Sequence, residues 1–304
     1  MSEMRAEPLS PIDTATLWPQ LGRLSTEIVA TRAGENLLLS SGLAATGLTR
    51  LPRIPRTIVV GVKRALRYRG VLVARELAGG AAWEIVSIRI ARTIDDETVG
   101  ALAAGAALEA ARRNGRILFV RYPESSPHAT GLQRAGLISY REEHLLALPR
   151  SGRSAETGAF RPAARSDRAG TFRLYCKAVP QHVRRSEALT QQEWRAVIDS
   201  FDCEKEYVAE GDRGIVAWAG FGERECHLIL EPGIEGLSDA ALDLIESHGP
   251  RHGTLVLGDD QDGLHDRAAE RGYTAMGVRL VCARRLAQLQ SLKEVSPLPA
   301  ESLA

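Results

Sequence analysis

The chain has 304 residues, of which 44% are hydrophobic and 25% charged, a composition typical of globular proteins. This length suits two domains of about 150 residues, each large enough to bury a core without disulfides or metals. No apolar run approaches the roughly 18 residues of a membrane span, and the first residues do not resemble a secretion signal. We therefore expect a cytoplasmic protein with no metal site and no membrane partner.

The net charge of +1 hides an asymmetry along the chain. Residues 1–150 carry 20 Lys and Arg against 14 Asp and Glu, whereas residues 151–304 carry 19 against 24. Between residues 36 and 75 there is no acidic residue. This stretch holds eight basic residues: Arg50, Arg53, Arg56, Lys63, Arg64, Arg67, Arg69 and Arg75. It could contact phosphates, lie on a solvated surface or dock onto the acidic second half. Because aromatic residues that stack on bases are nearly absent from it, we do not expect nucleic acid as a partner.

The first part of the chain opens with helix-like apolar spacing at residues 17–30 and 36–48. Strands are then predicted at 56–62, 70–77 and 83–90. Ala78-Gly79-Gly80 predicts the hairpin turn between the second and third of these, because glycine supplies the positive φ of tight turns. Acidic residues at 95–97 begin a helix that ends near Asn114-Gly115. A strand at 116–121, a short helix at 127–136 and a strand at 138–148 follow.

After a polar, Gly-containing stretch at residues 151–162, the same order of elements recurs. The predicted elements are a strand at 161–165, helices at 172–179 and 191–201, strands at 206–210, 214–220 and 227–230, a helix at 238–247, a strand at 254–257, a helix at 264–271 and a strand at 275–282. We therefore predict domains at 1–150 and 163–287, a linker at 151–162 and a flexible tail at 288–304. A duplicated α+β unit is the most economical explanation.

Three short segments resemble the GNAT N-acetyltransferase superfamily. Gln133-Arg134-Ala135-Gly136-Leu137 and Ala269-Glu270-Arg271-Gly272-Tyr273 look like the family's "k-x-G-F" stretch before its final strand. Leu228–Gly236 (LILEPGIEG) is similar to its passage from the central strand into the cofactor helix. The element order matches over nearly the whole chain. The resemblance implies an α+β fold of two tandem GNAT-like domains, each a mixed, mostly antiparallel sheet flanked by helices, with central strands splayed beside a V-shaped groove.

The resemblance also implies acetyl-CoA or another acyl-CoA as cofactor. In the family, the pattern Q/R-x-x-G-x-G/A follows the central strand, and its N–H groups at a helix N-terminus hold the coenzyme A pyrophosphate. The matches here keep a glycine, at Gly100 and Gly236, but lose the basic residue. Ser125 stands where the family often has an asparagine, and Ile90 lies on the predicted central strand. The implied cofactor-binding residues are therefore Ile90, Gly100, Ser125 and Gly236.

Acidic residues surround both glycine motifs. The first half has three, at positions 95, 96 and 97, and the second has Glu231 and Glu235. Carboxylates at a helix N-terminus stabilise the helix but repel a pyrophosphate. Lys63, Arg64 or Arg92 could compensate in the first half, and only Arg251 and Arg267 in the second. We therefore expect weak acetyl-CoA binding, on the order of tens to hundreds of micromolar, and only in the first half.

The catalytic candidate is Glu84, on the predicted central strand of the first half, where the family often places a general base. A glutamate there could deprotonate an amine directly or through water. Glu84 is either a buried functional acid or a residue at a wet strand end. His227 is its nearest counterpart in the second half, where a structural hydrogen bond fits better than catalysis. The family's usual general acid is a tyrosine, whereas Leu132 and Ala268 occupy the matching positions and cannot donate a proton.

Three functions are compatible with this sequence. The first is an acyl-CoA-dependent N-acyltransferase, active in one half and acting on an amine of a small molecule or a protein. The second is a catalytically inactive GNAT-fold protein that binds a protein partner. The third is a regulatory module that senses a small ligand in the groove. Fold analogy does not select among them.

Overall fold

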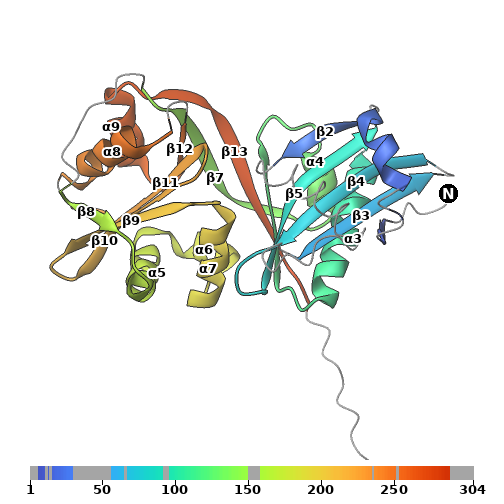
Figure 1. The fold of residues 1–304 in the computed structure, drawn as a ribbon, viewed down its shortest axis with the longest axis horizontal. Helices are drawn as coiled ribbons and strands as arrows, with labels where there is room; N and C mark the ends of the chain where they lie inside the picture. The colour runs from blue at the N-terminus through green and yellow to red at the C-terminus, as the bar shows by residue number, and fades with distance from the viewer. Residues whose placement is uncertain are drawn as a thin grey trace, which may run out of the picture.

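A computed structural model of the chain describes residues 6–10, 13, 16–29, 56–64, 67–91, 96–149, 158–234, 236–250 and 253–287. These residues form two lobes joined by two long strands that lie side by side (Figure 1). One mixed sheet runs through both lobes in the order β1-β3-β4-β5-β6-β13-β7-β12-β11-β10-β9-β8, and β2 pairs with β5 outside this path. None of the described helices is long and apolar enough to cross a membrane.

The two halves contain the following elements. The first half comprises β1 (Glu7–Pro8), the 3-10 helix η1 (Trp18–Arg23), β2 (Leu24–Val29), β3 (Thr57–Arg64), β4 (Arg67–Glu76), β5 (Ala82–Ala91), α3 (Asp96–Arg112), β6 (Ile117–Pro123), α4 (Ala129–Arg134) and β7 (Ile138–Ala147). The second half comprises β8 (Phe160–Pro162), the 3-10 helix η2 (Arg165–Asp167), α5 (Arg168–Ala178), α6 (Gln181–Glu187), α7 (Gln191–Ser200), β9 (Lys205–Gly211), β10 (Gly214–Phe221), β11 (Glu225–Leu230), α8 (Leu237–His248), β12 (Thr254–Gly258), α9 (Asp262–Glu270) and β13 (Thr274–Arg285).

The same order of elements occurs twice. Three antiparallel strands, β3-β4-β5 or β9-β10-β11, are followed by a helix, a strand parallel to the third, a short helix and a last antiparallel strand. The two parallel pairs are β5 with β6 and β11 with β12. This repetition confirms the predicted α+β fold of two similar, mostly antiparallel units flanked by helices.

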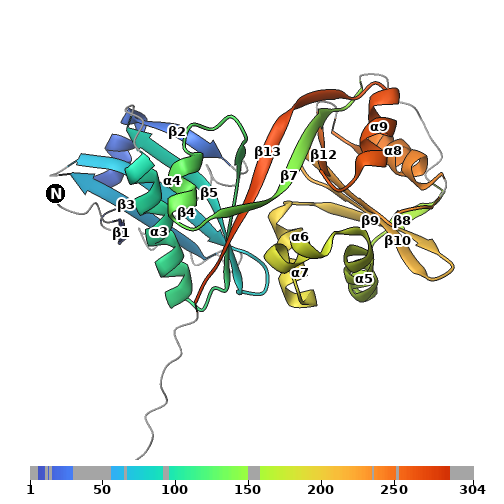
Figure 2. The same cartoon turned by 180° about the vertical axis from the view of Figure 1, so that it is seen from behind.

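The last strands of the two halves cross between the lobes. β13 lies between β6 and β7, and β7 lies between β13 and β12, so each last strand extends the sheet of the other half (Figure 2). Glu143 on β7 faces Arg279 on β13 in this central pair. The predicted division of the sequence at residues 151–162 stays a prediction. Residues 151–157 lie outside the described part, and Phe160–Pro162 form β8, which pairs with β9.

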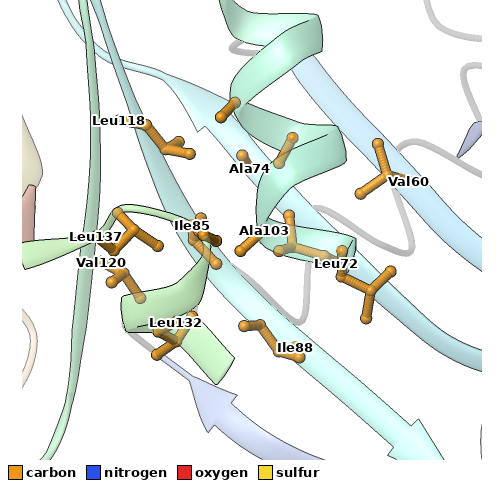
Figure 3. Packing of buried hydrophobic residues seen from close by; sticks show 14 of the residues in the cluster. Val60, Leu72, Ala74, Ile85, Ile88, Ala103, Leu118, Val120, Leu132 and Leu137 are labelled. Atoms are coloured by element: carbon orange, nitrogen blue, oxygen red, sulfur yellow. The ribbon is translucent and has the colours of Figure 1, made fainter. Parts of the chain in front are cut away.

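Helices cover the sheet differently in the two lobes. In the first, α3 and α4 pack on one face, where buried apolar side chains such as Leu72, Ile85, Leu118 and Leu132 meet (Figure 3). In the second lobe, α8 and α9 cover one face and α5, α6 and α7 cover the other. Trp194 on α7 lies in the core on that second face. The second lobe is therefore a sheet between two layers of helices.

The helix predicted at residues 17–30 is wrong over residues 24–29, which form strand β2 directly after the 3-10 helix η1. Thr26, Ile28 and Val29 are β-branched and favour a strand, and pairing with β5 supplies the partner that helical spacing could not reveal. Helix α6 was not predicted. The helix predicted at 238–247 begins at Leu237 as α8, and its N-cap is Gly236, which adopts a left-handed φ of 71°. The helix predicted at 36–48 and the tail at 288–304 lie outside the described residues.

Candidate functional site

Each half contains a point where its two parallel strands separate, which we call the splay. In the first half, β5 and β6 pair from Ala82 with Ile117 to Ile85 with Val120. After Ile85, β5 pairs along the same edge with β2 instead. This antiparallel pairing runs from Val29 with Ser87 to Leu24 with Ala91. β2 also contacts β6. The chain's own strand β2 therefore occupies the splay of the first half.

Ile90, a predicted cofactor-binding residue, lies in this filled splay. Its neighbours are Gly70 on β4 and Ser25 on β2, and the Ser25 hydroxyl donates to the Ile90 carbonyl at 3.1 Å. The Ile90 side chain is buried in the core beneath α3. Strands therefore flank the Ile90 backbone on both sides, where the resemblance implied a cofactor.

Glu84 is fully buried, with 0% of its surface exposed, so the interpretation as a wet strand end is wrong. The Arg75 guanidinium donates from Nε and Nη2 to Oε2 of Glu84 at 3.0 and 2.8 Å. Arg121 donates from Nη1 to Oε1 at 2.6 Å. Both carboxylate oxygens thus accept charge-assisted hydrogen bonds, which stabilise the anion. Its role as a general base stays a prediction, and the geometry favours a structural one.

Glu84 belongs to a series of buried ion pairs that crosses from one lobe to the other. Arg121 Nε lies 3.3 Å from Oε1 of Glu143, and Arg279 Nε donates to Oε2 of Glu143 at 2.8 Å. Arg279 also donates from Nη1 and Nη2 to both oxygens of Glu225, at 2.9 and 3.1 Å. We call this set the ion-pair ladder; its members are Arg75, Glu84, Arg121, Glu143, Arg279 and Glu225.

The arginines of the ladder lower the pKa of two of its carboxylates, those of Glu143 and Glu225. Burial alone would raise the pKa of Glu143, but Arg279 and Arg121 outweigh it and lower this pKa to about 2. Burial likewise opposes ionisation of Glu225, whereas the nearby His227 imidazole, the Arg279 charge and the hydrogen bonds from Arg279 lower its pKa well below the usual range. Removing one member would leave its partners buried and unpaired, which is strongly destabilising.

The sequence patterns predict a site role for Glu84 but for none of the other ladder residues. The available signal was a single charge within an otherwise apolar strand, as at Arg121 in ILFVRYP and Arg279 in GVRLVCA. Such a charge at an inward-facing position needs a buried partner. Those partners lie on other strands, and Glu143 and Arg279 come from different halves of the chain, so strand patterns alone could not identify them.

The splay of the second half is not filled by a strand. β11 and β12 pair from Glu225 with Thr254 to His227 with Val256 and then separate. Along Leu228–Leu230, no strand within the described residues pairs with the edge that faces away from β10. Gln261 Nε2 donates to the Leu228 carbonyl at 3.1 Å. The rest of this short edge can accept an added strand-like ligand.

The open edge leads directly to the N-terminus of α8. Gly236 is its N-cap, with no side-chain cap, and Gly233 has a φ of 80°. A Cβ placed on either glycine would meet no atom within 4 Å. The first N–H groups of a helix have no intrahelical partners and attract anions. Gly236, a predicted cofactor-binding residue, therefore lies at an exposed helix N-terminus with free space around it.

Two of the carboxylates near the start of α8, those of Glu231 and Asp239, are paired with basic side chains. Lys177 on α5 donates to both oxygens of Glu231 at 3.0 and 3.1 Å. Arg267 on α9 donates to both oxygens of Asp239, in the first turn of α8, at 2.7 and 2.9 Å. The expectation of uncompensated charge at Glu231 is therefore wrong, because Lys177 is remote in sequence but adjacent in space. Glu235 lies outside the described residues.

The predicted site residues of the first half do not converge. Gly100 lies inside α3, where an added Cβ would stand 3.1 Å from the Gly131 carbonyl on α4, so close helix packing explains this glycine. Ser125 is exposed in the turn after β6. Glu84 and Ile90 lie towards opposite ends of β5, and Gly236 belongs to the other lobe. The structure thus gathers no single site from the five predicted residues.

His227 occupies the position in the second half that Glu84 holds in the first. Glu84 faces Phe119 across its parallel pair, and His227 faces Val256. The imidazole is 4% exposed and stacks on Phe201, with ring centres 4.2 Å apart. Its Nε2 lies 3.6 Å from Oε2 of Glu225. His227 also lines a cavity of about 20 Å³ in the splay, which is room for one water molecule.

Among the described residues, no group of three or more His, Cys, Asp or Glu side chains could hold a metal ion. No family model matches the sequence. No curated protein matches it either.

Several solved structures resemble the whole chain. A tandem GNAT protein from the clavulanic acid biosynthesis pathway is 15% identical, with 93% of this chain and 98% of that chain aligned and a TM-score of 0.47. A GCN5-related N-acetyltransferase from Sphaerobacter thermophilus is 12% identical over 94% and 96%, with a TM-score of 0.49. A Drosophila protein is 12% identical over 92% and 98%, with a TM-score of 0.50. At such identities the likeness concerns the fold alone.

Proposed function

We propose that the protein is an acyl-CoA-dependent N-acyltransferase that holds its cofactor in the second half, in the splay between β11 and β12. The acceptor would be an amine of a small molecule or a protein. One observation carries this proposal: the unpaired edge at Leu228–Leu230 leads into the uncapped N-terminus of α8, where Gly233 and Gly236 leave open space.

The second half supplies two kinds of contact for coenzyme A. Its pantetheine amides would pair with the free edge of β11, as an added strand does. Its pyrophosphate would bind the N–H groups at the start of α8. Because Lys177 and Arg267 pair with Glu231 and Asp239, these two carboxylates repel a pyrophosphate less at this helix end. When bound, the cofactor would supply an acyl thioester for transfer to the amine.

His227 is the residue best placed to move a proton in this half. A water in the adjacent cavity would pass the proton of the acceptor ammonium to the imidazole. Oε2 of Glu225, 3.6 Å from Nε2, would stabilise the imidazolium that results. The first half offers no equivalent, because β2 fills its splay and two arginines hold Glu84.

A catalytically inactive binding protein is the second candidate. Ala268 replaces the family's tyrosine in this half and is fully buried, as is Leu132 in the first. Phe201 also covers His227 at a stacking distance of 4.2 Å. These features favour a protein that binds acyl-CoA or a protein partner without transferring the acyl group.

Calorimetric titration of acetyl-CoA into the full chain tests the binding. We expect a dissociation constant on the order of 10–100 μM. Gly236→Asp should weaken it about tenfold, since it adds a carboxylate where the pyrophosphate binds. Gly236→Asn is the matched control, because Asn also tolerates a left-handed φ but carries no charge. Equal affinities of the two variants, or no binding at about 1 mM ligand, would refute the proposed site.

Thiol release in the presence of an amine mixture separates the two candidates. If the protein is a transferase, His227→Gln should lower turnover by about 10²–10⁴ while acetyl-CoA still binds. Binding of acetyl-CoA without turnover on any amine would favour the inactive protein.

A further inference from the structure

A cavity of about 520 Å³ lies where the two halves meet, away from the free edge of β11; we call it the junction pocket. It is lined by residues of η2, α5, α7 and β9 and by Ala78 in the β4–β5 hairpin of the first half. The Ala78 N–H donates to Oδ2 of Asp199 at 2.9 Å, and Gln192 Nε2 donates to the Gly79 carbonyl at 3.1 Å. Both halves therefore build this pocket, and its volume lies in the range of about 300–1,000 Å³ of small-molecule sites.

The inner wall of the junction pocket is closely packed. Trp194 is 3% exposed and stacks on Tyr175, with ring centres 4.1 Å apart. Thr171, also in the wall, is 9% exposed. Asp202 accepts from Arg75 of the ion-pair ladder, which fixes the turn after α7. A preformed wall lowers the entropic cost of binding a ligand.

Three arginines line the pocket without a partner in the described part of the chain. Arg165, Arg168 and Arg195 make no ion pair or side-chain hydrogen bond with any residue that the structure describes. By contrast, Arg161 nearby binds Asp167 and Glu210. Uncommitted guanidinium groups around one cavity favour carboxylate or phosphate ligands, which they bind in pairs of parallel hydrogen bonds.

Two carboxylates in the same pocket each retain a free oxygen. Asp199 uses Oδ2 for the Ala78 N–H, and Glu206 uses Oε2 to accept from Trp218 Nε1 at 2.8 Å. Within the described residues, their other oxygens accept no hydrogen bond. These oxygens suit an ammonium group, which donates three hydrogen bonds.

We propose that the junction pocket binds a small acidic amino acid, that is, a molecule with one ammonium group and two carboxylates. The three arginines would hold the carboxylates, and Asp199 and Glu206 would hold the ammonium. A ligand of net charge −1 balances the excess of one positive charge among these five side chains. The site is separate from the proposed acyl-CoA site, so each proposal can fail without the other.

Calorimetric titration of the full chain with L-glutamate tests this proposal against two matched compounds. Glutarate lacks the ammonium group, and 4-aminobutyrate lacks one carboxylate. We expect L-glutamate to bind with a dissociation constant on the order of 0.1–1 mM, and each matched compound to bind at least about fivefold more weakly. The absence of saturable binding up to about 10 mM, or equal binding of glutarate and L-glutamate, would overturn the proposal.

Variants assign the binding to this pocket. Arg168→Ala combined with Arg195→Ala should weaken L-glutamate binding about tenfold or more. Arg173→Ala is the matched control, since Arg173 is exposed on α5 outside the pocket. Asp199→Asn with Glu206→Gln keeps the hydrogen-bond acceptors and should reduce L-glutamate affinity to that of glutarate. If Arg173→Ala weakens binding as much as the pocket variants do, the loss reflects the overall charge of the protein, and L-glutamate does not bind in the junction pocket.

Discussion

The two halves repeat one topology but differ in what surrounds their central strands. In the first, Arg75 on β4 faces Glu84; at the matching position in the second, Gly220 on β10 faces His227. The space where β5 and β6 part holds β2, whereas Leu228–Leu230 keep a free edge where β11 and β12 part. One fold thus supports a filled, ion-paired half and an open half.

Because the surroundings of the central strands differ, the two halves share a topology but not a role. The central carboxylate of the first half is held between guanidinium groups and contributes to the junction of the lobes. The central imidazole of the second half lies beside a small cavity and a glycine-lined helix end. We infer that the first half stabilises the molecule and the second half binds the ligand.

The largest expected effect of a substitution is therefore at Glu84. Glu84→Gln leaves Arg75 and Arg121 buried with an uncharged partner, and we expect a loss of about 3–5 kcal/mol in the free energy of unfolding. His227→Gln, its counterpart in the second half, should cost about 1 kcal/mol. Urea denaturation of both variants measures the difference. Similar losses at the two positions would remove the distinction between the halves.

Acid should weaken the ladder. The folded-state pKa of Glu143 is lowered from 4.5 to about 2, so Glu143 contributes stability that is present above pH 4.5. This contribution, on the order of 3 kcal/mol, is lost as the pH falls through that interval. Unfolding curves recorded between pH 5 and 3 should therefore show a steeper loss in the native protein than in Glu143→Gln. Parallel curves would contradict the assignment.

Much of the fold could be predicted because strand alternation and helix ends are local signals. The turn at Ala78-Gly79-Gly80 is confirmed, with both glycines at positive φ, and so is the helix end at Asn114, which has a φ of 62°. Residues 24–29 were assigned wrongly because their strand conformation depends on pairing with β5, more than fifty residues away in the sequence. The crossing of β7 and β13 is equally non-local.

Less of the candidate site could be predicted. Gly236 was found because its glycine motif is local, and the structure places it at a helix N-terminus. Glu84 was identified as important, but its arginine partners lie on two other strands, and no spacing in the sequence links them. Gly100 matches the same glycine motif, but the structure explains this glycine by the close approach of Gly131 on α4. The motifs therefore located the glycines, but they did not reveal the surrounding residues, which decide whether a glycine binds a ligand or allows close packing.

A charge added at Ser125, an exposed cofactor-binding residue predicted in the first half, should have little effect on acetyl-CoA binding. Ser125 is exposed after β6, and Ser125→Asp should change acetyl-CoA affinity by less than about twofold. The same calorimetric titration used for the Gly236 variants provides the measurement. A tenfold loss of acetyl-CoA affinity in Ser125→Asp would indicate that the cofactor binds in the first half.

The smallest effect is expected on the basic surface of the first half. Arg64 and Arg67 flank the turn between β3 and β4, and Arg64→Glu with Arg67→Glu should change the free energy of unfolding by less than about 0.5 kcal/mol. Any binding to a polyanion such as heparin should be weak and should disappear as salt is raised. A tight complex with DNA or RNA at physiological salt would show that this surface is a nucleic-acid site.

Hydrogen exchange of the full chain with and without acetyl-CoA tests the central claim most directly, because it reports on both halves in one experiment. If the second half holds the cofactor, the ligand should slow exchange in residues 228–230 and in the first turn of α8, beginning at Leu237. Exchange at residues 87–91 of β5 and in the first turn of α3 should stay unchanged, because β2 already occupies that splay. Protection in β5 and α3 with none in β11 and α8 would contradict the account.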